Sequence, residues 1–225
     1  MENKESYLTL SNSSTGEYKE KGSKFLAYAF PVLSENSFKE QLSIIKTEHP
    51  NGRHFCYAFR FGINGEQYRY SDDGEPKNSA GSPIYGQLLS KELTNIAIVV
   101  VRYFGGTKLG VGGLVNAYKT AAKEALENGK IITKKLTETY KIEFTYDKMS
   151  AIMAFISQHQ LTITKQHFEL TCFVEIELEK ANAAAIIEKF SEIQDISIEE
   201  VWINSHNGYT NYKIKFKTYP LIQLY

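Results

Sequence analysis

The features that this sequence lacks narrow the class of protein before any motif is considered. Its 225 residues include only two cysteines, Cys56 and Cys172, each inside an expected strand and far apart in the chain. That usage supports neither a disulfide framework nor a cysteine-based zinc site. There is no run of about 18 apolar residues for a membrane span, and the opening MENKESYLTL has no basic and apolar signal segment. We therefore expect a cytoplasmic protein with reduced cysteines and no membrane partner.

An excess of charge of either sign is also missing. Lys+Arg number 26 and Asp+Glu number 26, which gives a formal net charge of zero. The global attraction that draws a basic protein to nucleic acid is therefore absent, and any such binding has to be local. The arginines, however, all lie in the first half of the chain, at Arg53, Arg60, Arg69 and Arg102. The planar guanidinium suits phosphate, so the distribution indicates either a phosphate contact in that half or a chance clustering of four residues.

Familiar catalytic and cofactor motifs are absent too. The chain has no H-E-x-x-H, no G-x-S-x-G and no Walker A loop. No serine or cysteine nucleophile has a recognisable partner, and His54, the best-placed histidine, is interpreted as a hydrogen-bonded structural residue. The sequence favours binding over catalysis, and it assigns no cofactor and no metal.

What is present is an ordinary globular composition, with 42% hydrophobic and 23% charged residues. The length predicts two domains. In the first half, periodicity predicts strands at 6–10, 24–31, 54–61, 67–70 and 95–101, and helices at 34–48, 82–91 and 114–128. The aromatic face of 54–61 is interpreted as core, and 95–101 (NIAIVVV) as a buried central strand.

The pattern restarts after Lys134. It predicts strands at 138–145, 161–166, 171–178 and 196–203, with helices at 148–158 and 181–190. This βαββαβ order is that of a ferredoxin-like domain, so the fold class is α+β with domains 1–133 and 134–225. Two charged faces, Glu175, Glu177 and Glu179 on one strand and Lys213, Lys215 and Lys217 on a C-terminal strand, are interpreted as solvated faces or a cross-strand charge match.

The first informative motif is the acidic loop SDDGEP. Asp72, Asp73 and Glu75 place three carboxylates within four positions, and their mutual repulsion requires a cation, a helix N-terminus or backbone donors nearby. Two interpretations remain open. The loop holds magnesium through one or two of its carboxylates, or it is an acidic turn with local hydrogen bonds, which we favour.

The second informative motif is VRYFGGTKLGVGGL, which starts at Val101. It places five glycines in nine positions between a buried strand and a helix. Glycine allows backbone to approach a ligand closely, and amide groups at a helix start attract anions. Arg102 and Lys108 flank these glycines, so phosphate contact is at least as well supported as a tight packing turn.

Together HFCYAFRFG, SDDGEP with AGSPI, and VVVRYFGGTKLGVGGL followed by Ala117 and Tyr118 resemble the signature of the YigZ/IMPACT family. The stretch SKFLAYAFPV is similar to that family's opening, and the second half is similar to the additional domain of its bacterial members. The resemblance implies a first domain like domain 2 of ribosomal protein S5 and a ferredoxin-like second domain like the C-terminal domain of elongation factor G. It also implies a link to translational control. Asn116 stands where relatives commonly have Arg, and Val111 where they often have Thr.

Three functions are therefore considered. The first is a translation-linked regulator that binds RNA or the ribosome through a glycine-rich anion-binding surface. The residues assigned to that surface are Arg102, Lys108, Gly105, Gly106, Gly110, Gly112, Gly113, Arg60 and Arg69, beside the acidic loop Asp72, Asp73 and Glu75 and supported by His54 and Tyr103. The second is a metal-dependent phosphoryl-transfer enzyme or phosphohydrolase that uses the acidic loop for magnesium. The third is a regulator that binds a protein partner and no nucleic acid.

The sequence makes one further prediction about the site. The acidic loop needs positive charge or amide donors, and the glycine-rich segment is rich in both. We expect the two motifs to meet in space, with Asp73 or Glu75 paired with Arg102 or Lys108 or accepting glycine amides.

Overall fold

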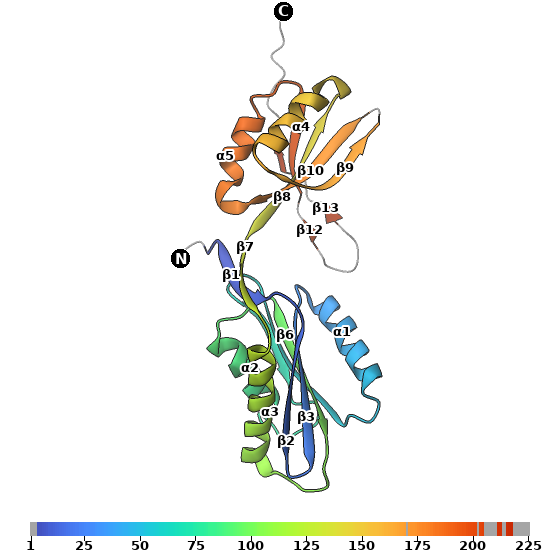
Figure 1. Ribbon diagram of the computed structural model, residues 1–225, viewed down its shortest axis with the longest axis vertical. Helices are drawn as coiled ribbons and strands as arrows, with labels where there is room; N and C mark the ends of the chain where they lie inside the picture. The colour runs from blue at the N-terminus through green and yellow to red at the C-terminus, as the bar shows by residue number, and fades with distance from the viewer. Residues whose placement is uncertain (1–3, 170, 202, 205–210, 213–214, 218–225) are drawn as a thin grey trace, which may run out of the picture. The chain divides into compact units, whose positions relative to one another are not determined.

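The computed structural model describes residues 4–169, 171–201, 203–204, 211–212 and 215–217 of the chain. The chain divides into two compact units, residues 1–134 and 135–225, and each is described by itself. Helices and strands of both units together make an α+β fold, as expected from the sequence (Figure 1).

The first unit is built on a five-stranded sheet in which every neighbouring pair is antiparallel. In spatial order its strands are β2 (Ser14–Glu20), β3 (Ser23–Pro31), β6 (Ile96–Tyr103), β4 (His54–Phe61) and β5 (Gln67–Ser71). The central strand is β6, whose run of β-branched residues is buried from Ile96 to Arg102. A separate two-stranded sheet joins β1 (Ser6–Leu10) and β7 (Ile131–Lys135).

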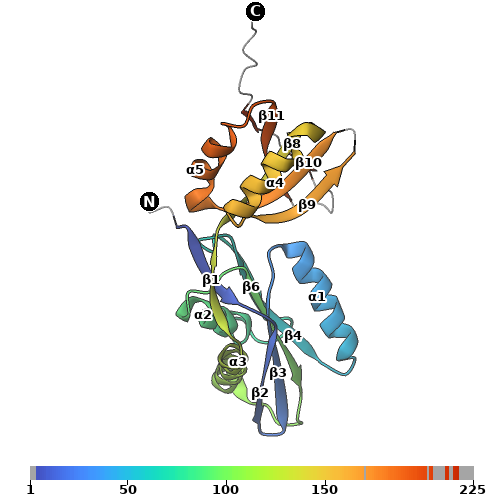
Figure 2. The same ribbon diagram turned by 45° about the horizontal axis from the view of Figure 1, so that its top comes forward.

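Both faces of this five-stranded sheet are covered by helices (Figures 1 and 2). On one face lie α2 (Gly81–Ser90) and α3 (Gly110–Glu127), and Tyr118 of α3 is completely buried there. On the other face, Phe38 of α1 (Glu35–Glu48) packs against the aromatic rings of β4. Because side chains alternate along a strand, successive residues of β6 face α3 and α1 in turn.

Three expectations about the first unit need correction. The strand β2 was not predicted, because its sequence STGEYKE has little apolar alternation. The strand packs closely on α3: a Cβ on Gly16 would lie 2.4 Å from the Ala125 amide nitrogen. Helix α3 begins at Gly110, four residues earlier than expected, so three of the five glycines form its first turn. We also expected the glycine-rich connection to be a ligand site because it leaves the carboxyl end of the central strand, as in open α/β sheets. This sheet is antiparallel, so that rule does not explain the site.

The second unit has the expected ferredoxin-like order. Its strands β8 (Thr137–Phe144), β9 (Thr162–Phe168), β10 (Cys172–Glu179) and β11 (Ile196–Val201) alternate with the helices α4 (Met149–Gln158) and α5 (Lys180–Phe190). The sheet order is β14-β11-β8-β10-β9, and a 3-10 turn at Tyr146–Lys148 precedes α4. Both helices pack on the face of β10 that carries Val174 and Ile176 (Figure 2).

Short strands complete the second unit. They are β12 (Ile203–Asn204), which pairs with β13 (Asn211–Tyr212), and β14 (Lys215–Lys217). Glu175, Glu177 and Glu179 lie on the β10 face away from the core, whereas Lys213 and the side chains of Lys215 and Lys217 lie outside the described part of the chain. No helix among the described residues is long and apolar enough to cross a membrane.

Cleavage between Thr133 and Lys134 is expected to leave two fragments that fold separately. Each unit has its own hydrophobic core, and a unit that buries its own apolar surface has the means to fold alone. Circular dichroism melting curves of residues 1–133 and 134–225 test this. If neither fragment melts cooperatively, the boundary is misplaced.

Candidate functional site

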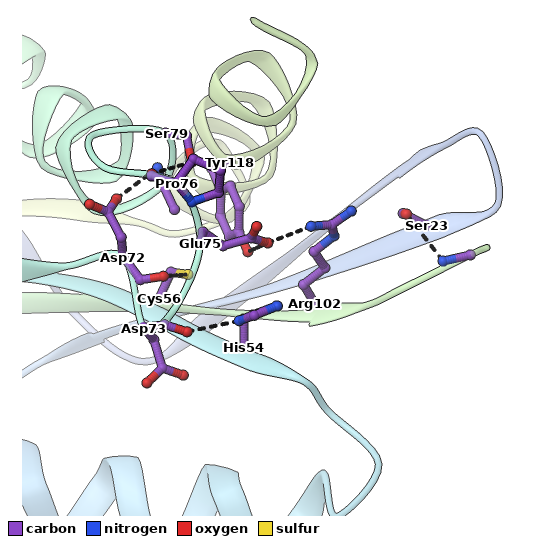
Figure 3. Close-up of polar contacts among 12 residues, drawn as sticks. Ser23, His54, Cys56, Asp72, Asp73, Glu75, Pro76, Ser79, Arg102 and Tyr118 are labelled. Atoms are coloured by element: carbon purple, nitrogen blue, oxygen red, sulfur yellow. Dashed lines mark hydrogen bonds and ion pairs between the residues drawn. The ribbon is translucent and has the colours of Figure 1, made fainter. Parts of the chain in front are cut away.

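The acidic loop and the glycine-rich segment meet at one end of the central sheet (Figure 3). The register pairs His54, the first residue of β4, with Arg102 near the end of β6. The acidic loop follows β5 and precedes α2, so hydrogen bonding of β5 to β4 brings the loop beside His54. Strand pairing therefore gathers segments that are about 30 residues apart in sequence.

Asp72 is a structural member of the loop. Its Oδ1 accepts the amides of Ala80 at 3.0 Å and Gly81 at 2.9 Å, and its Oδ2 accepts the amide of Asn78 at 2.8 Å. Ala80 stands at the N-cap of α2 and has no capping side chain of its own. Asp72 therefore caps this helix from a distance, and helix-start amides offset its negative charge.

Asp73 fastens the loop to the start of β4. Its Oδ2 accepts the amide of Phe55 at 2.6 Å, and its backbone oxygen accepts Nδ1 of His54 at 2.8 Å. A carbonyl can only accept, so the hydrogen of a neutral His54 lies on Nδ1. The expected structural role of His54 as a hydrogen-bonded residue agrees with this contact.

Glu75 makes the predicted link between the two motifs. Its Oε1 accepts Nη1 of Arg102 at 2.6 Å and the hydroxyl of Tyr118 at 2.8 Å. The side chains of Glu75 and Arg102 are only 4% and 7% exposed. Removing one partner of such a pair leaves an uncompensated buried charge, which is why the whole arrangement depends on both residues.

Arg102 is held between two aromatic rings as well as by Glu75. Its Cζ lies 5.5 Å from the ring centres of Phe25 and of Phe104. Its Nε is buried and has no hydrogen-bond partner among the described residues. The guanidinium therefore retains an unused donor at the wall of the site.

Two further groups in the network are held in their neutral forms. Burial raises the pKa of the Cys56 thiol and, more strongly, that of the Tyr118 hydroxyl. The Cys56 thiol donates to the backbone oxygen of Asp72 at 3.0 Å. A buried thiol whose pKa is raised is a poor nucleophile, so Cys56 serves packing and Tyr118 remains a donor to Glu75.

The five glycines have different roles. A Cβ on Gly105 would lie 1.9 Å from the carbonyl carbon of Gly22 at the β2–β3 hairpin, so Gly105 serves close packing. At Gly106, Gly110 and Gly112 a Cβ would meet no atom within 4 Å. Backbone at these three positions is therefore open to a ligand, whereas Gly113 lies against Leu109.

A cleft of about 450 Å³ opens where these elements meet. Its lining residues are Arg53, His54, Glu75, Pro76, Arg102, Phe104, Lys108, Leu109, Gly110, Val111 and Leu114. Arg53 and Lys108 are exposed, and neither is in an ion pair with another residue in the described part of the chain. Since Glu75 offsets the charge of Arg102, these two side chains supply the free positive charge of the cleft.

The first turn of α3 forms one wall of the cleft. Its N-cap, Leu109, makes no side-chain hydrogen bond, and the first turn contains no acidic residue. Its leading amides are therefore left for water or an anion, and the helix dipole favours negative charge there. The glycine-rich sequence predicts an anion site here, and three of its five glycines lie in this first turn of the helix.

The structure does not bring two of the predicted arginines to the cleft. Arg60 lies at the far end of β4, where its guanidinium donates to the backbone oxygens of Leu93 at 3.2 Å and Asn64 at 2.7 Å. Arg69 on β5 forms an ion pair with Glu35 of α1 at 2.8 Å. Both guanidinium groups have structural partners away from the cleft.

Tyr103 also lies elsewhere, because it follows Arg102 and so faces α1 instead of α3. Its hydroxyl lies 2.7 Å from Nδ1 of His49, whose Nε2 lies 2.5 Å from the hydroxyl of Tyr28. Tyr103 thus helps to fasten the end of α1 to the sheet. Alternation along β6 could have placed it there from sequence.

Three residues that belong to the site were missed by sequence reasoning. Arg53 and Phe104 line the cleft, and Tyr118 completes the Glu75 network. Phe104 lies inside the glycine-rich segment and Arg53 directly precedes β4, so their positions carried a signal. Tyr118 carried no signal in the sequence beyond its place in the motif, because a tyrosine on the apolar face of a helix is usually interpreted as a core residue.

The alternative in which the acidic loop holds magnesium is not supported by this geometry. Asp72 faces the start of α2 and Glu75 faces Arg102 (Figure 3). The Asp73 carboxylate accepts the amide of Phe55. Three carboxylates that point to different partners share no coordination centre. Among the described residues, no group of three or more His, Cys, Asp or Glu side chains comes together as a metal site.

Comparisons with known proteins place this arrangement in context. A family model described as the Impact N-terminal domain matches residues 21–126. The IMPACT family member YvyE of Bacillus subtilis (strain 168) is 30% identical over 188 residues, 84% of this chain and 87% of its own length. The IMPACT family member YigZ of Escherichia coli (strain K12) is 32% identical over 182 residues, 78% and 88% of the two chains. A crystal structure described as that of a hypothetical protein has a TM-score of 0.68 and 29% identity, and covers 87% of this chain and 97% of its own.

Proposed function

The chain belongs to the IMPACT family, and from that premise we propose that it is a translation-linked regulator that binds RNA or the ribosome through the cleft at the start of α3. The family resemblance of its motifs carries the link to translation. The chemistry of the cleft carries the proposal of RNA as the ligand.

The observation that supports RNA most directly is the grouping of anion-binding features around one cleft. The side chains of Arg53 and Lys108, which form no ion pair with any described residue, and the start of α3, which has no side-chain cap among those residues, surround it. Phosphate oxygens are the acceptors that such donors bind, and they occur at every nucleotide of RNA. A protein with zero net charge can therefore bind RNA at this one place.

The interior of the cleft explains why the buried ion pair does not cancel the attraction. Glu75 is engaged by Arg102 and Tyr118 and is almost completely buried. The carboxylate therefore stabilises the wall of the cleft by its buried contacts with Arg102 and Tyr118. Arg53 and Lys108, in contrast, are exposed to the solvent. Phosphate binds beside the pair and does not have to displace it.

We expect a fluorescent RNA oligonucleotide to bind in a salt-sensitive manner. The logarithm of the association constant falls by about 0.7 for each neutralised phosphate of a single strand per unit of log salt. Substituting Lys108→Ala should weaken binding and make the salt slope shallower by about 0.7, the contribution of one phosphate contact. The matched control is Lys123→Ala, an exposed lysine further along α3 that pairs with Glu127, and it should bind as the parent does.

The proposal fails if the parent protein binds neither RNA nor ribosomes at low salt. If Lys108→Ala and Lys123→Ala have equal effects, the proposal that RNA binds in this cleft is wrong. In that case any RNA contact lies outside this cleft.

A further inference from the structure

Phosphate binding leaves the apolar part of the cleft unexplained. Besides its donors, the cleft is lined by Pro76, Phe104, Leu109, Val111 and Leu114. Phe104 is 41% exposed and Val111 57% exposed, although large apolar side chains favour burial. A site for phosphate alone has no use for such a lining, so the ligand also has an apolar part.

Phe104 is the side chain best placed to receive a flat apolar group. The guanidinium of Arg102 lies over its ring at 5.5 Å, which supports the ring through a cation–π contact. Arg102 is in turn fixed by Glu75 and by the ring of Phe25. The ring is therefore held in place while much of its surface remains open to the solvent.

The polar side of the ligand is set by two independent features that face the same cleft. The start of α3 offers amides at Gly110 and the residues after it, beside the ammonium group of Lys108, which pairs with no acid in the described part of the chain. Arg102 is only 6% exposed, lines the cleft, and has an Nε without a partner among the described residues. A ligand with an acceptor next to its flat group satisfies the helix amides and Lys108, while the charge of Arg102 in the wall adds to the attraction.

We infer that the cleft holds one unpaired nucleotide of an RNA strand, with its base on Phe104 and its phosphate at the start of α3. This inference rests on the proposed function and names the form of RNA that the cleft selects. Unpaired bases stack on aromatic rings, whereas bases inside a duplex are already stacked and paired. The volume of about 450 Å³ lies within the range of sites that enclose a small ligand.

An acidic peptide is the other ligand that a cationic cleft attracts. Its carboxylates would use Lys108 and the helix start, but a carboxylate does not stack on the ring of Phe104, because the face of an aromatic ring is itself negative. The exposed, supported ring is the feature that favours a nucleotide, and it also separates the two ligands in an experiment.

The experiment compares labelled oligouridylate with the same strand annealed to oligoadenylate, at one low salt concentration. We expect the single strand to bind more tightly than the duplex to the full-length protein. Phe104→Ala should weaken single-strand binding about 5- to 150-fold, the equivalent of roughly 1–3 kcal/mol for one stacked base. Phe104→Trp keeps a stacking surface and should retain binding.

Two controls keep the test decisive. Tyr146→Ala removes a 73% exposed ring from the second unit and should leave affinity unchanged. Melting curves of the two Phe104 variants establish that both fold. Equal binding of single strand and duplex, with no loss in Phe104→Ala, overturns this inference and leaves the proposed function intact.

Two other outcomes exclude the stacked nucleotide, and the first of them also excludes the proposed function. If neither RNA nor ribosomes bind while an aspartate-rich peptide binds in a Phe104-dependent manner, the ligand is a peptide and both proposals are wrong. If binding to RNA depends on Lys108 but not on Phe104, phosphate contact alone explains it and the stacked nucleotide is excluded.

Discussion

Glu75→Ala is expected to destabilise the protein by about 3–5 kcal/mol, the range measured when a buried ion pair loses one partner. The carboxylate of Glu75 is the only described group that forms an ion pair with Arg102, and both side chains are almost completely buried. The substitution leaves the guanidinium charge without compensation and removes the acceptor of the Tyr118 hydroxyl. Urea unfolding followed by circular dichroism measures the change.

The double variant Glu75→Leu with Arg102→Met separates lost charge pairing from lost packing. Because it removes both charges, it should recover part of the stability that Glu75→Ala loses. The matched control is Glu40→Ala on the exposed face of α1, which should change the free energy of unfolding by no more than about 0.5 kcal/mol. A loss below about 1 kcal/mol in Glu75→Ala would contradict the structural role given to the pair.

Gly112→Asp is expected to change stability and RNA binding in opposite directions. A Cβ at this position meets no atom within 4 Å, and the first turn of α3 has no acidic residue. An aspartate there should stabilise the helix by about 0.3–1 kcal/mol through the helix dipole. The same charge occupies the place proposed for phosphate, and two like charges 4 Å apart near a protein surface repel by roughly 4 kcal/mol. Even a third of that repulsion lowers RNA affinity about tenfold.

Gly112→Ala is the matched control, because it fills the same space without adding charge. It should raise stability and lower RNA affinity less than Gly112→Asp does, because a methyl group crowds the phosphate without repelling its charge. Thermal melting and RNA titration of both variants test the prediction together. If Gly112→Asp is more stable and binds RNA as the parent does, phosphate does not lie at the start of α3.

Much of the fold follows from the sequence because its patterns are local. The alternation of β4 and the β-branched run of β6 identify both strands, and Ser34 caps α1 through the Ser37 amide as its type predicts. The strand β2 lacks such a pattern, since Gly16 is needed for close contact with α3 and contributes no side chain. Its existence depends on a tertiary contact that a local pattern does not contain.

The sequence predicted the kind of interactions at the candidate site better than it predicted which residues lie there. Repulsion among the acids required a partner for each, and the pairing of Glu75 with Arg102 follows that argument. The capping of α2 by Asp72 and the placement of Arg60 at the far end of β4 depend on strand register and loop path. Phe104 was missed because an aromatic residue beside glycines does not reveal whether its ring is exposed.

The central claim is that the cleft attracts RNA through Arg53, Lys108 and the start of α3. Sedimentation of ribosomes with the parent protein and with the Arg53→Ala, Lys108→Ala double variant, at low and at high salt, tests it most directly. We predict that the parent sediments with ribosomes at low salt, is released at high salt, and that the double variant stays in the supernatant at both. The absence of the parent from the ribosome fraction at low salt, or equal sedimentation of the double variant, would contradict the claim.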